Sequence, residues 1–433
     1  MVQVKQLVFS EGERYPMLVD SEGVPDFWVT LYVTENLRVS LKQTSIENTI
    51  RHLIHLKLWE EINGRDLISE FSQAKFLSDS DIISIRDHCL LNSNHIEEWQ
   101  QITSKKNVVK LSVIYPGRTR HRKVVSKGHA ANRLVHIASY LYFVARTKLR
   151  TRENFIALTG SIDDMKKRII AQKPKGAKNK GLSTDPDSKA PPPEIFENLM
   201  KMVREDSPDN PYKNSSIRIR NALMFDIMYI TGMRSGEVLG LQISDIEFQR
   251  ASISVTRRHD NPLDHRRRQS VLKTNERDIP VPQALVNRIR AYVMEERSKI
   301  PGANKGPFLF VTHKRGEFQG KAISDSTFRN RILKPAILTN LELFNEIHRH
   351  GFRHNFNNSL SKKIDEHNRR ARIDPTIKPI KEKEELQLRK YLNGWSSDSS
   401  AEIYNLRHIK EMSNKLLRED MDDMSKHLNK EKK

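Results

Sequence analysis

The feature that most constrains the fold of this chain is a stretch that cannot pack as a helix or a strand. Residues 172–193 read QKPKGAKNKGLSTDPDSKAPPP, rich in Lys, Gly, Ser and Pro, with no apolar periodicity. Such a composition is typical of a flexible, basic linker. A chain of 433 residues is also too long for one compact core. We therefore expect the linker to separate two parts that each fold around a core of their own.

The part before the linker is predicted to be a short arm followed by a helical domain. Residues 1–25 read as an extended arm, and residues 26–171 as mostly helical. Apolar side chains recur there at helical spacing. The segments that show this spacing are 45–62, 79–90 and 130–149.

The part after the linker is predicted to be a mixed domain at 194–410, followed by a charged helical tail at 411–433. Two β-type runs, 251–258 and 270–281, flank a polar loop, which predicts a hairpin. Helical periodicity appears around it at 194–204, 215–231, 282–298, 325–338, 353–367 and 381–392. The expected fold class is therefore mainly α, with a small β-sheet in the second domain.

The charge of the chain indicates a polyanionic partner. Lys and Arg number 75 against 54 Asp and Glu, a formal net charge of +21, and nucleic acid is the commonest partner of such an excess. Cys89 is the one cysteine, and no Cys/His cluster has zinc spacing, so neither a disulfide nor a metal is expected. No signal core and no apolar run of about 20 residues is present, so we expect a cytoplasmic protein without a membrane partner.

Four short segments carry candidate catalytic residues, and their order along the chain is the strongest signal. They read TGMRSGEVLGL, VLKTNERDIPV, HGFRHNF and a final GW that is followed nine residues later by a tyrosine. The candidates, in chain order, are Arg234, Lys273, His350, Arg353, Trp395 and Tyr404.

This ordered set resembles the catalytic signature of the tyrosine recombinases, also called phage integrases. The resemblance covers about residues 190–410, and residues 26–171 are similar to the family's core-DNA-binding domain in size, helicity and charge only. The resemblance implies an α+β catalytic domain that cleaves and rejoins DNA through a 3′-phosphotyrosine and a Holliday junction, without metal, ATP or other cofactor. It also implies a homotetramer on double-stranded DNA recombination sites, in which the tail docks on a neighbouring protomer.

The resemblance further implies a biological setting. It points to a bacterial mobile element and to a place on the nucleoid. A DNA-bending protein or a directionality factor is a possible further partner. The target sequence and the direction of the reaction are not encoded in any motif of the chain.

The two arginines suit phosphoryl transfer. A guanidinium binds two phosphate oxygens in one plane, and cations at these oxygens stabilise the charge of the transition state. Glu237 follows Arg234 by three residues, on the same helical face, and is expected to orient it. His350 precedes Arg353 by the same spacing, so both can reach one phosphate. The choice of His350 over His348 and His354 rests on the resemblance.

The remaining three candidates take their roles from the resemblance. Lys273 is similar to the mobile lysine that protonates the leaving 5′ oxygen. Trp395 stands where many family members have His, and its indole N–H donates one hydrogen bond but carries no proton. Tyr404 is the nucleophile, whose pKa near 10 requires nearby cations to favour the phenolate. Tyr391 and Tyr229 lack the spacing.

A basic stretch of the first domain, GRTRHRKVVSKGHAANR, is the best candidate for gripping the DNA backbone. Its candidate contact residues are Arg118, Arg120, Arg122, Lys123, Lys127 and Arg133.

One departure and two alternatives accompany this interpretation. Arg353 and Trp395 are separated by 41 residues, more than is usual in the family, and the excess around 363–383 is predicted to be a surface insertion. A type IB topoisomerase-like relaxase would use the same residues without paired sites. An inactive, architectural DNA-binding protein would not need them, so the intact set favours the recombinase.

Overall fold

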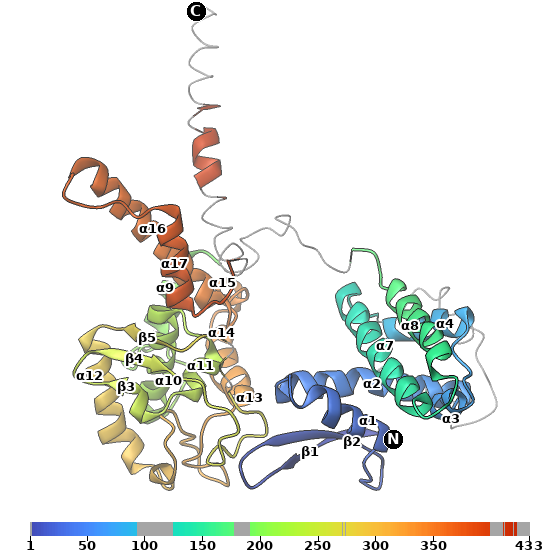
Figure 1. Ribbon diagram of the computed structural model, residues 1–433. Coiled ribbons are helices and arrows are strands. Elements are labelled where there is room, and N and C mark those ends of the chain that lie inside the picture. The colour runs from blue at the N-terminus through green and yellow to red at the C-terminus, as the bar shows by residue number, and fades with distance from the viewer. Residues whose placement is uncertain are drawn as a thin grey trace, which may run out of the picture. The chain divides into compact units, whose positions relative to one another are not determined.

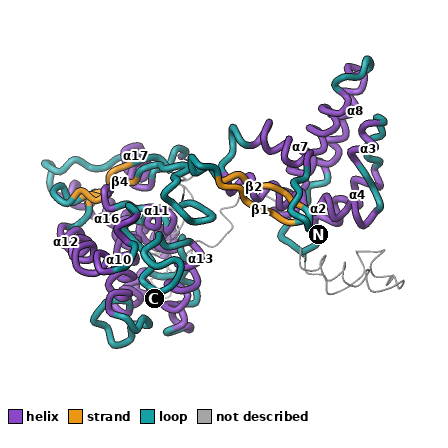
Figure 2. Tube along the Cα trace, turned by 90° about the horizontal axis from the view of Figure 1, so that it is seen from below, coloured by secondary structure: helices purple, strands orange, loops and turns teal. Residues whose placement is uncertain are grey.

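The computed structural model (Figure 1) describes residues 2–92, 124–176, 191–270, 272, 274–398, 410, 412–418 and 420–421. The chain forms two compact units, the first from Met1–Phe9 and Arg14–Lys180, the second from Ser10–Glu13 and Gly181–Lys433. Helices dominate and strands are few (Figure 2), so the prediction of a mainly α protein with a small antiparallel sheet in its second unit is confirmed. Within the described part of the chain, no helix combines the length and the apolar character needed to cross a membrane.

The first unit begins with a hairpin where an extended arm was expected. Strands β1 (Gln3–Val8) and β2 (Arg14–Val19) pair antiparallel, with Gln3 opposite Val19. Tyr15 and Leu18 of β2 are buried in the core of this unit. Apolar burial therefore holds β2, and with it the paired strand β1, in the first unit.

The other elements of the first unit are helical. In chain order they are α1 (Phe27–Tyr32), η1 (Val33–Leu37), α2 (Gln43–Asn63), α3 (Leu67–Ser72), α4 (Asp79–Leu90), α7 (Lys127–Leu149) and α8 (Phe155–Ala171). The three predicted helices are confirmed as α2, α4 and α7. Helices α1 and α3 were missed because six residues are too few to display a helical period.

Arg133 of α7 lies in the interior of this unit. Its side chain is 2% exposed, and Nη1 donates to the carbonyl oxygens of Cys89 (2.8 Å) and Leu91 (2.6 Å). The guanidinium therefore closes the C-terminal end of α4, whose last carbonyl groups have no helical partner. The prediction that Arg133 contacts the DNA backbone is wrong, because a buried guanidinium cannot reach a phosphate on the surface.

Histidine rings cluster between α2, α4 and α7, around Arg133. The ring of His52 stacks on that of His136, with centroids 5.0 Å apart, and the rings of His55 and His88 lie 5.7 Å apart. Burial, and then neighbouring cations including Arg133, lower the pKa of His52 to about 3, of His55 to about 2 and of His88 to about 4. These rings are therefore neutral in the folded unit at neutral pH.

We predict that the first unit loses stability as the pH falls below 6.5. The unfolded chain binds a proton at each of these histidines near pH 6.5, whereas the folded unit does not. Each ring then lowers the unfolding free energy by about 1.4 kcal/mol per pH unit until its folded-state pKa is reached. Hydrogen exchange of α2 and α7, corrected for intrinsic rates, measures this between pH 7.5 and 5.0. His55→Gln should make the stability of the first unit less dependent on pH. Equal protection of the α2 and α7 amides at pH 7.5 and 5.0 would contradict the prediction.

The second unit carries a three-stranded antiparallel sheet, β3 (Ile246–Glu247), β4 (Ser252–Val255) and β5 (Arg277–Pro280), in the order β3-β4-β5. Ser252 lies opposite Pro280, so the predicted pairing of two runs is confirmed, but both strands are shorter than predicted. The segment between them is rich in charged and polar residues and lacks the alternation that would continue either strand.

Helices surround this sheet. They are α9 (Pro193–Met202), α10 (Ser215–Thr231), α11 (Ser235–Gly240), α12 (Gln283–Ala291), α13 (Asp325–Thr327), α14 (Lys334–Leu338), α15 (Leu341–Phe344), α16 (Gly351–Ile373) and α17 (Glu382–Asn393). Short helical turns complete the unit: η3 (Ile243–Asp245), η4 (Tyr292–Glu296), η5 (Arg297–Lys299), η6 (Ala303–Lys305) and η7 (Phe328–Leu333). The predicted helix at 325–338 is confirmed as the continuous run of α13, η7 and α14.

Helix α10 forms the centre of the second unit. Leu223, Met224, Phe225, Ile227 and Met228 are all fully buried. A helix whose buried apolar side chains point in several directions must be covered on several sides, and α10 contacts α9, α11, α12 and α16. The end of α10 is thereby fixed, and the candidate catalytic segment begins at that end.

The excess length at 363–383 extends α16 and adds a loop that returns to α17. The side chain of Asn368 closes this loop: Nδ2 donates to the carbonyl of Ile380 (3.0 Å), and Oδ1 accepts from its N–H (2.7 Å). Most side chains of the extension are exposed, and in Figure 1 its end projects from the body of the unit. The insertion is therefore on the surface.

Candidate active site

The turn between α10 and α11 places Arg234. Gly232 ends α10 with φ +63°, and a Cβ there would lie 2.5 Å from the ring of Phe356. Only glycine combines this left-handed conformation with so close an approach. Arg234 follows in extended conformation as the N-cap of α11, and its backbone N–H donates to Glu237 Oε2 (3.1 Å).

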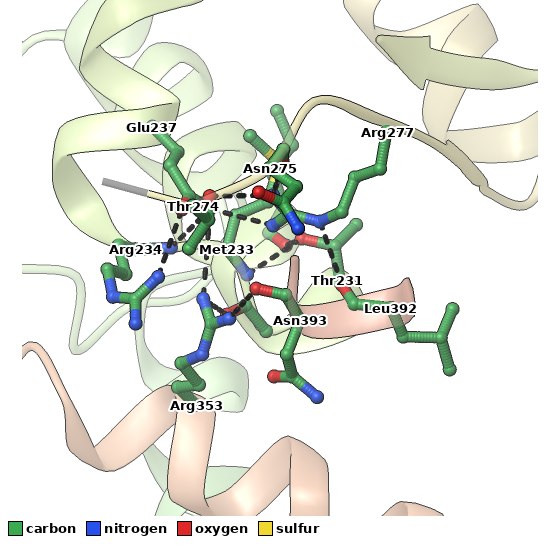
Figure 3. A network of polar contacts seen from close by, with 12 residues as sticks. Thr231, Met233, Arg234, Glu237, Thr274, Asn275, Arg277, Arg353, Leu392 and Asn393 are labelled. Atoms are coloured by element: carbon green, nitrogen blue, oxygen red, sulfur yellow. Dashed lines mark hydrogen bonds and ion pairs between the residues drawn. The ribbon is translucent and has the colours of Figure 1, made fainter. Parts of the chain in front are cut away.

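The carboxylate of Glu237 lies at the centre of the polar network that forms the site (Figure 3). Its carboxylate accepts from Arg277 Nη2 (2.9 Å), Arg234 Nη1 (3.3 Å) and Thr274 Oγ1 (2.9 Å), and Arg353 Nη1 lies 3.8 Å away. These partners come from β5, the N-cap of α11, the hairpin loop and α16. One buried carboxylate thus joins four segments of the chain.

The three arginines differ in exposure. The side chains of Arg277 and Arg353 are 1% exposed, whereas that of Arg234 is 23% exposed. Burial alone would raise the pKa of Glu237, but Arg277, then Arg353 and Arg234, together hold it below its usual value. One carboxylate cannot neutralise three guanidinium groups, so the cluster keeps a positive charge that attracts an anion, and Arg234 presents it to solvent.

Arg353 is fixed from several sides. Nη1 donates to the carbonyl of Gly232 (3.3 Å), and Nη2 donates to the carbonyl of Asn393 at the end of α17. The amides of Asn357 and Asn393 exchange hydrogen bonds of 3.0 Å, which locks α17 to α16. The guanidinium lies over the ring of Trp395, 5.5 Å from the ring centroid to Cζ.

A second glycine sets the position of Trp395. Gly394 ends α17 with φ +66°, and a Cβ there would lie 2.8 Å from Thr274, Asn275 and Arg277. The N–H of Asn275 donates to the carbonyl of Gly394 (2.8 Å). This close approach of backbones fixes the hairpin loop against α17 and leaves Trp395 buried, 5% exposed, beside the arginine cluster.

Arg277 is the site residue that the sequence analysis missed. Besides its ion pair with Glu237, its Nε donates to the carbonyl of Leu392 (2.9 Å), so it ties β5 both to α11 and to α17. A signal was present in the strand, since Arg277 shares the inward-facing phase with Ile279. An arginine on the core face of a strand requires an acidic or carbonyl partner inside.

His350 immediately precedes α16 and is an exposed residue. Partial burial and the nearby cations, chiefly Arg349 and Arg234, lower its pKa. The imidazole is therefore neutral at neutral pH, with one nitrogen that donates a hydrogen bond and one that accepts a proton.

The structure thus brings Arg234 and Arg353 together at Glu237, with Trp395 against Arg353. His350 lies close enough for both arginines to lower its pKa. Two predicted catalytic residues, Lys273 and Tyr404, lie outside the described residues. Among the predicted DNA contacts, Lys127 is exposed in the first turn of α7. Those outside the described residues are Arg118, Arg120, Arg122 and Lys123.

We predict that Arg277→Met destabilises the second unit by about 3 kcal/mol or more, because it removes the closest cation from a buried carboxylate. The control is Arg329→Met, which breaks the exposed pair of Arg329 with Asp325 and should cost about 1 kcal/mol or less. Urea unfolding followed by circular dichroism measures both. Equal losses in the two variants would show that the Arg277 pair contributes no more than a surface pair.

The chain is similar in sequence to known proteins. Residues 194–366, which include Arg234, His350 and Arg353, match the sequence profile of the Phage integrase family. Over 148 residues the chain is 24% identical to tyrosine recombinase XerD of Halalkalibacterium halodurans, a match that covers 34% of this chain and 42% of that protein. The chain therefore aligns with less than half the length of this relative.

Two solved structures are also similar. The XerH site-specific recombinase bound to palindromic difH substrate is 16% identical, covers 78% of this chain and 84% of its own, and gives a TM-score of 0.40. The Tn1549 transposon integrase in complex with transposon right end DNA is 15% identical, covers 71% and 92%, and gives a TM-score of 0.36.

Proposed function

We propose that this chain, which belongs to the phage integrase family of tyrosine recombinases, is a site-specific recombinase that cleaves and rejoins DNA through a 3′-phosphotyrosine at Tyr404. The observation that carries the proposal is the convergence of Arg234 and Arg353 on one buried carboxylate, Glu237, with the ring of Trp395 against Arg353. Such a cluster is built before substrate arrives. It therefore stabilises the charge that develops on a phosphate without rearranging during the reaction.

The arginines supply the electrostatic part of the mechanism. Arg234 has the exposed guanidinium, so it is the group that reaches a non-bridging oxygen of the scissile phosphate. Arg353 is held by carbonyl oxygens of two segments and contributes a fixed positive charge behind it. The indole N–H of Trp395 can donate one further hydrogen bond to the phosphate.

Tyr404 and Lys273 supply the covalent and proton-transfer parts. The phenolic oxygen of Tyr404 attacks phosphorus while the bond to the 5′ oxygen breaks, and Lys273 protonates the leaving oxygen. The 5′-hydroxyl of a partner strand then attacks the phosphotyrosine, which releases Tyr404 and reseals the DNA. The ester bond is exchanged, so neither step consumes ATP.

His350 is proposed as the acceptor of the Tyr404 proton. Its lowered pKa keeps one ring nitrogen unprotonated at neutral pH, as a general base requires. The nearby arginines that lower this pKa also favour the phenolate over the phenol.

The remaining parts of the proposal concern assembly. We propose that residues 26–171 bind the core DNA site, that 172–193 act as a linker, and that 194–410 form the catalytic domain. In the tail, Met412, Leu416, Leu417 and Met421 expose apolar side chains at helical spacing, suited to docking on a neighbouring protomer. Four protomers would then exchange strands between two duplex sites through a Holliday junction. This takes place in the bacterial cytoplasm, on the nucleoid, with a DNA-bending or directionality factor where the site requires one.

We predict that a Tyr404-dependent covalent adduct forms on DNA. The substrate is the sequence that flanks the gene, with a 5′-bridging phosphorothiolate at the cut so that the adduct accumulates. Denaturing gels should show the adduct for the wild type, without metal or ATP, and none for Tyr404→Phe. Tyr391→Phe is the control and should retain it. An adduct that persists in Tyr404→Phe would disprove the nucleophile, and no adduct with DNA binding intact would favour an architectural protein.

We predict that single-turnover cleavage keeps its rate as the pH falls from 7.5 to 6.5, because the pKa of His350 lies below its usual value. Below the lowered pKa the ring binds a proton and the rate declines. His350→Gln should be slower throughout and should lose this acidic decline, whereas His354→Gln should keep it. A wild-type rate already halved at pH 6.5 would contradict the role of a neutral His350.

A further inference from the structure

A second positively charged site of the second unit shares no residue with the arginine cluster. It is a cavity of about 720 Å³ between the hairpin loop, the loop before α13, and η7. We call it the basic cavity, defined by Arg220, Arg267, Lys314, Arg315, Phe318 and Arg331. A volume of this size is typical of a pocket for a small organic ligand and larger than a lone phosphate needs.

Three cations of the basic cavity lack protein partners. Lys314, Arg315 and Arg331 are exposed, and none forms a hydrogen bond or an ion pair with the described part of the chain. Glu317 is the one carboxylate among the described residues of the lining, and it pairs with none of them. Cations that face one concave space raise its potential together. The cavity is therefore suited to an anion.

Arg220 adds to this potential from below the surface. It is 6% exposed; its Nε and Nη2 donate to Asn221 Oδ1 and its Nη1 to the carbonyl of Val311. All these acceptors are neutral, and no carboxylate of the described chain lies within ion-pair distance. The charge of this buried guanidinium is therefore not cancelled by the protein, and it acts on the adjoining cavity at low dielectric.

The cavity also offers an aromatic face. Phe318 is 53% exposed, with its ring centroid 6.0 Å from that of His265 and 5.4 Å from Lys321 Nζ. An exposed ring among cations is what an unpaired nucleic acid base stacks on, while the cations hold its phosphate. An acidic peptide would use only the cations of the cavity, and the exposed ring of Phe318 would then have no function.

We propose that the basic cavity binds a nucleotide of an unpaired DNA strand, with its phosphate at Lys314, Arg315 and Arg331 and its base against Phe318. The proposal rests on the proposed function in taking DNA as the partner. Cleavage by Tyr404 leaves a DNA strand with a free 5′ end. The nucleotides at this end must unpair from their complement before the strand can be exchanged. A cavity for an unpaired nucleotide would hold such a segment.

The test measures binding of a single-stranded oligonucleotide to the full chain by fluorescence anisotropy over a range of salt. The cavity variant is Lys314→Gln/Arg315→Gln/Arg331→Gln. The matched control, Lys201→Gln/Lys299→Gln/Lys305→Gln, removes three exposed cations of the same unit. They form no side-chain hydrogen bond or ion pair with the described residues and lie outside the cavity lining. A third variant, Phe318→Ala, removes the ring and no charge.

We expect the cavity variant to bind at least tenfold more weakly than the control. The slope of log K against log salt should be shallower by about 0.7, since the cavity holds one phosphate and each phosphate neutralised on a single strand contributes about 0.7. Phe318→Ala should weaken single-strand binding about fivefold or more, with the salt dependence unchanged. Duplex DNA with no unpaired base should not respond to Phe318→Ala.

Two results would overturn the proposal. One is a cavity variant whose affinity and salt dependence equal those of the control. The other is calorimetric binding of deoxythymidine monophosphate to the wild type and not to the cavity variant, with single-strand affinity equal in both, which would make the ligand a free nucleotide. Failure of the proposed function is a separate observation, the absence of a Tyr404-dependent adduct, and neither result above depends on it.

Discussion

The structure of the second unit depends on one carboxylate, that of Glu237, placed among three guanidinium groups. Arg234, Arg277 and Arg353 repel one another, and their repulsion grows as water is excluded. Glu237 makes their close approach possible, through two oxygens that serve cations from different segments. Because Glu237 neutralises part of their charge, four segments can pack at one place. These segments are the hairpin loop, α11, α16 and α17.

Glu237 neutralises only part of the charge of the three arginines, and the positive charge that remains is what can bind a phosphate. A second carboxylate would reduce the excess positive charge of the cluster and would compete with a phosphate for Arg234. With one, the two buried arginines donate to protein acceptors while the third keeps part of its guanidinium exposed. A phosphodiester then adds a second negative charge to the cluster. Because the supporting arginines are held by the fold, little reorganisation accompanies that step.

Sequence reasoning found what depends on local pattern and missed what depends on distant contacts. Periodicity predicted the long helices, and the ordered motifs pointed to Arg234, Arg353 and Trp395. Arg277 acts through Glu237 and Leu392, 40 and 115 residues away, and no local pattern encodes those partners. The error at Arg133 is different in kind. Counting basic residues ignored that it shares the buried face of α7 with Ala130 and Ile137, which helical spacing already indicates.

Buried arginines of the second unit have three kinds of surroundings. Comparing them separates a structural role from a binding role. Arg277 is paired with a carboxylate, and Arg297 donates to three backbone carbonyl oxygens. Arg297 shows that neutral oxygens suffice to hold a buried guanidinium, so the lack of a carboxylate at Arg220 does not by itself imply a ligand. What distinguishes Arg220 is the cavity beside it, where Lys314 and its neighbouring cations add charge of the same sign. Like charges gathered around one empty space raise the energy of the free protein, and an anion that enters it removes that cost.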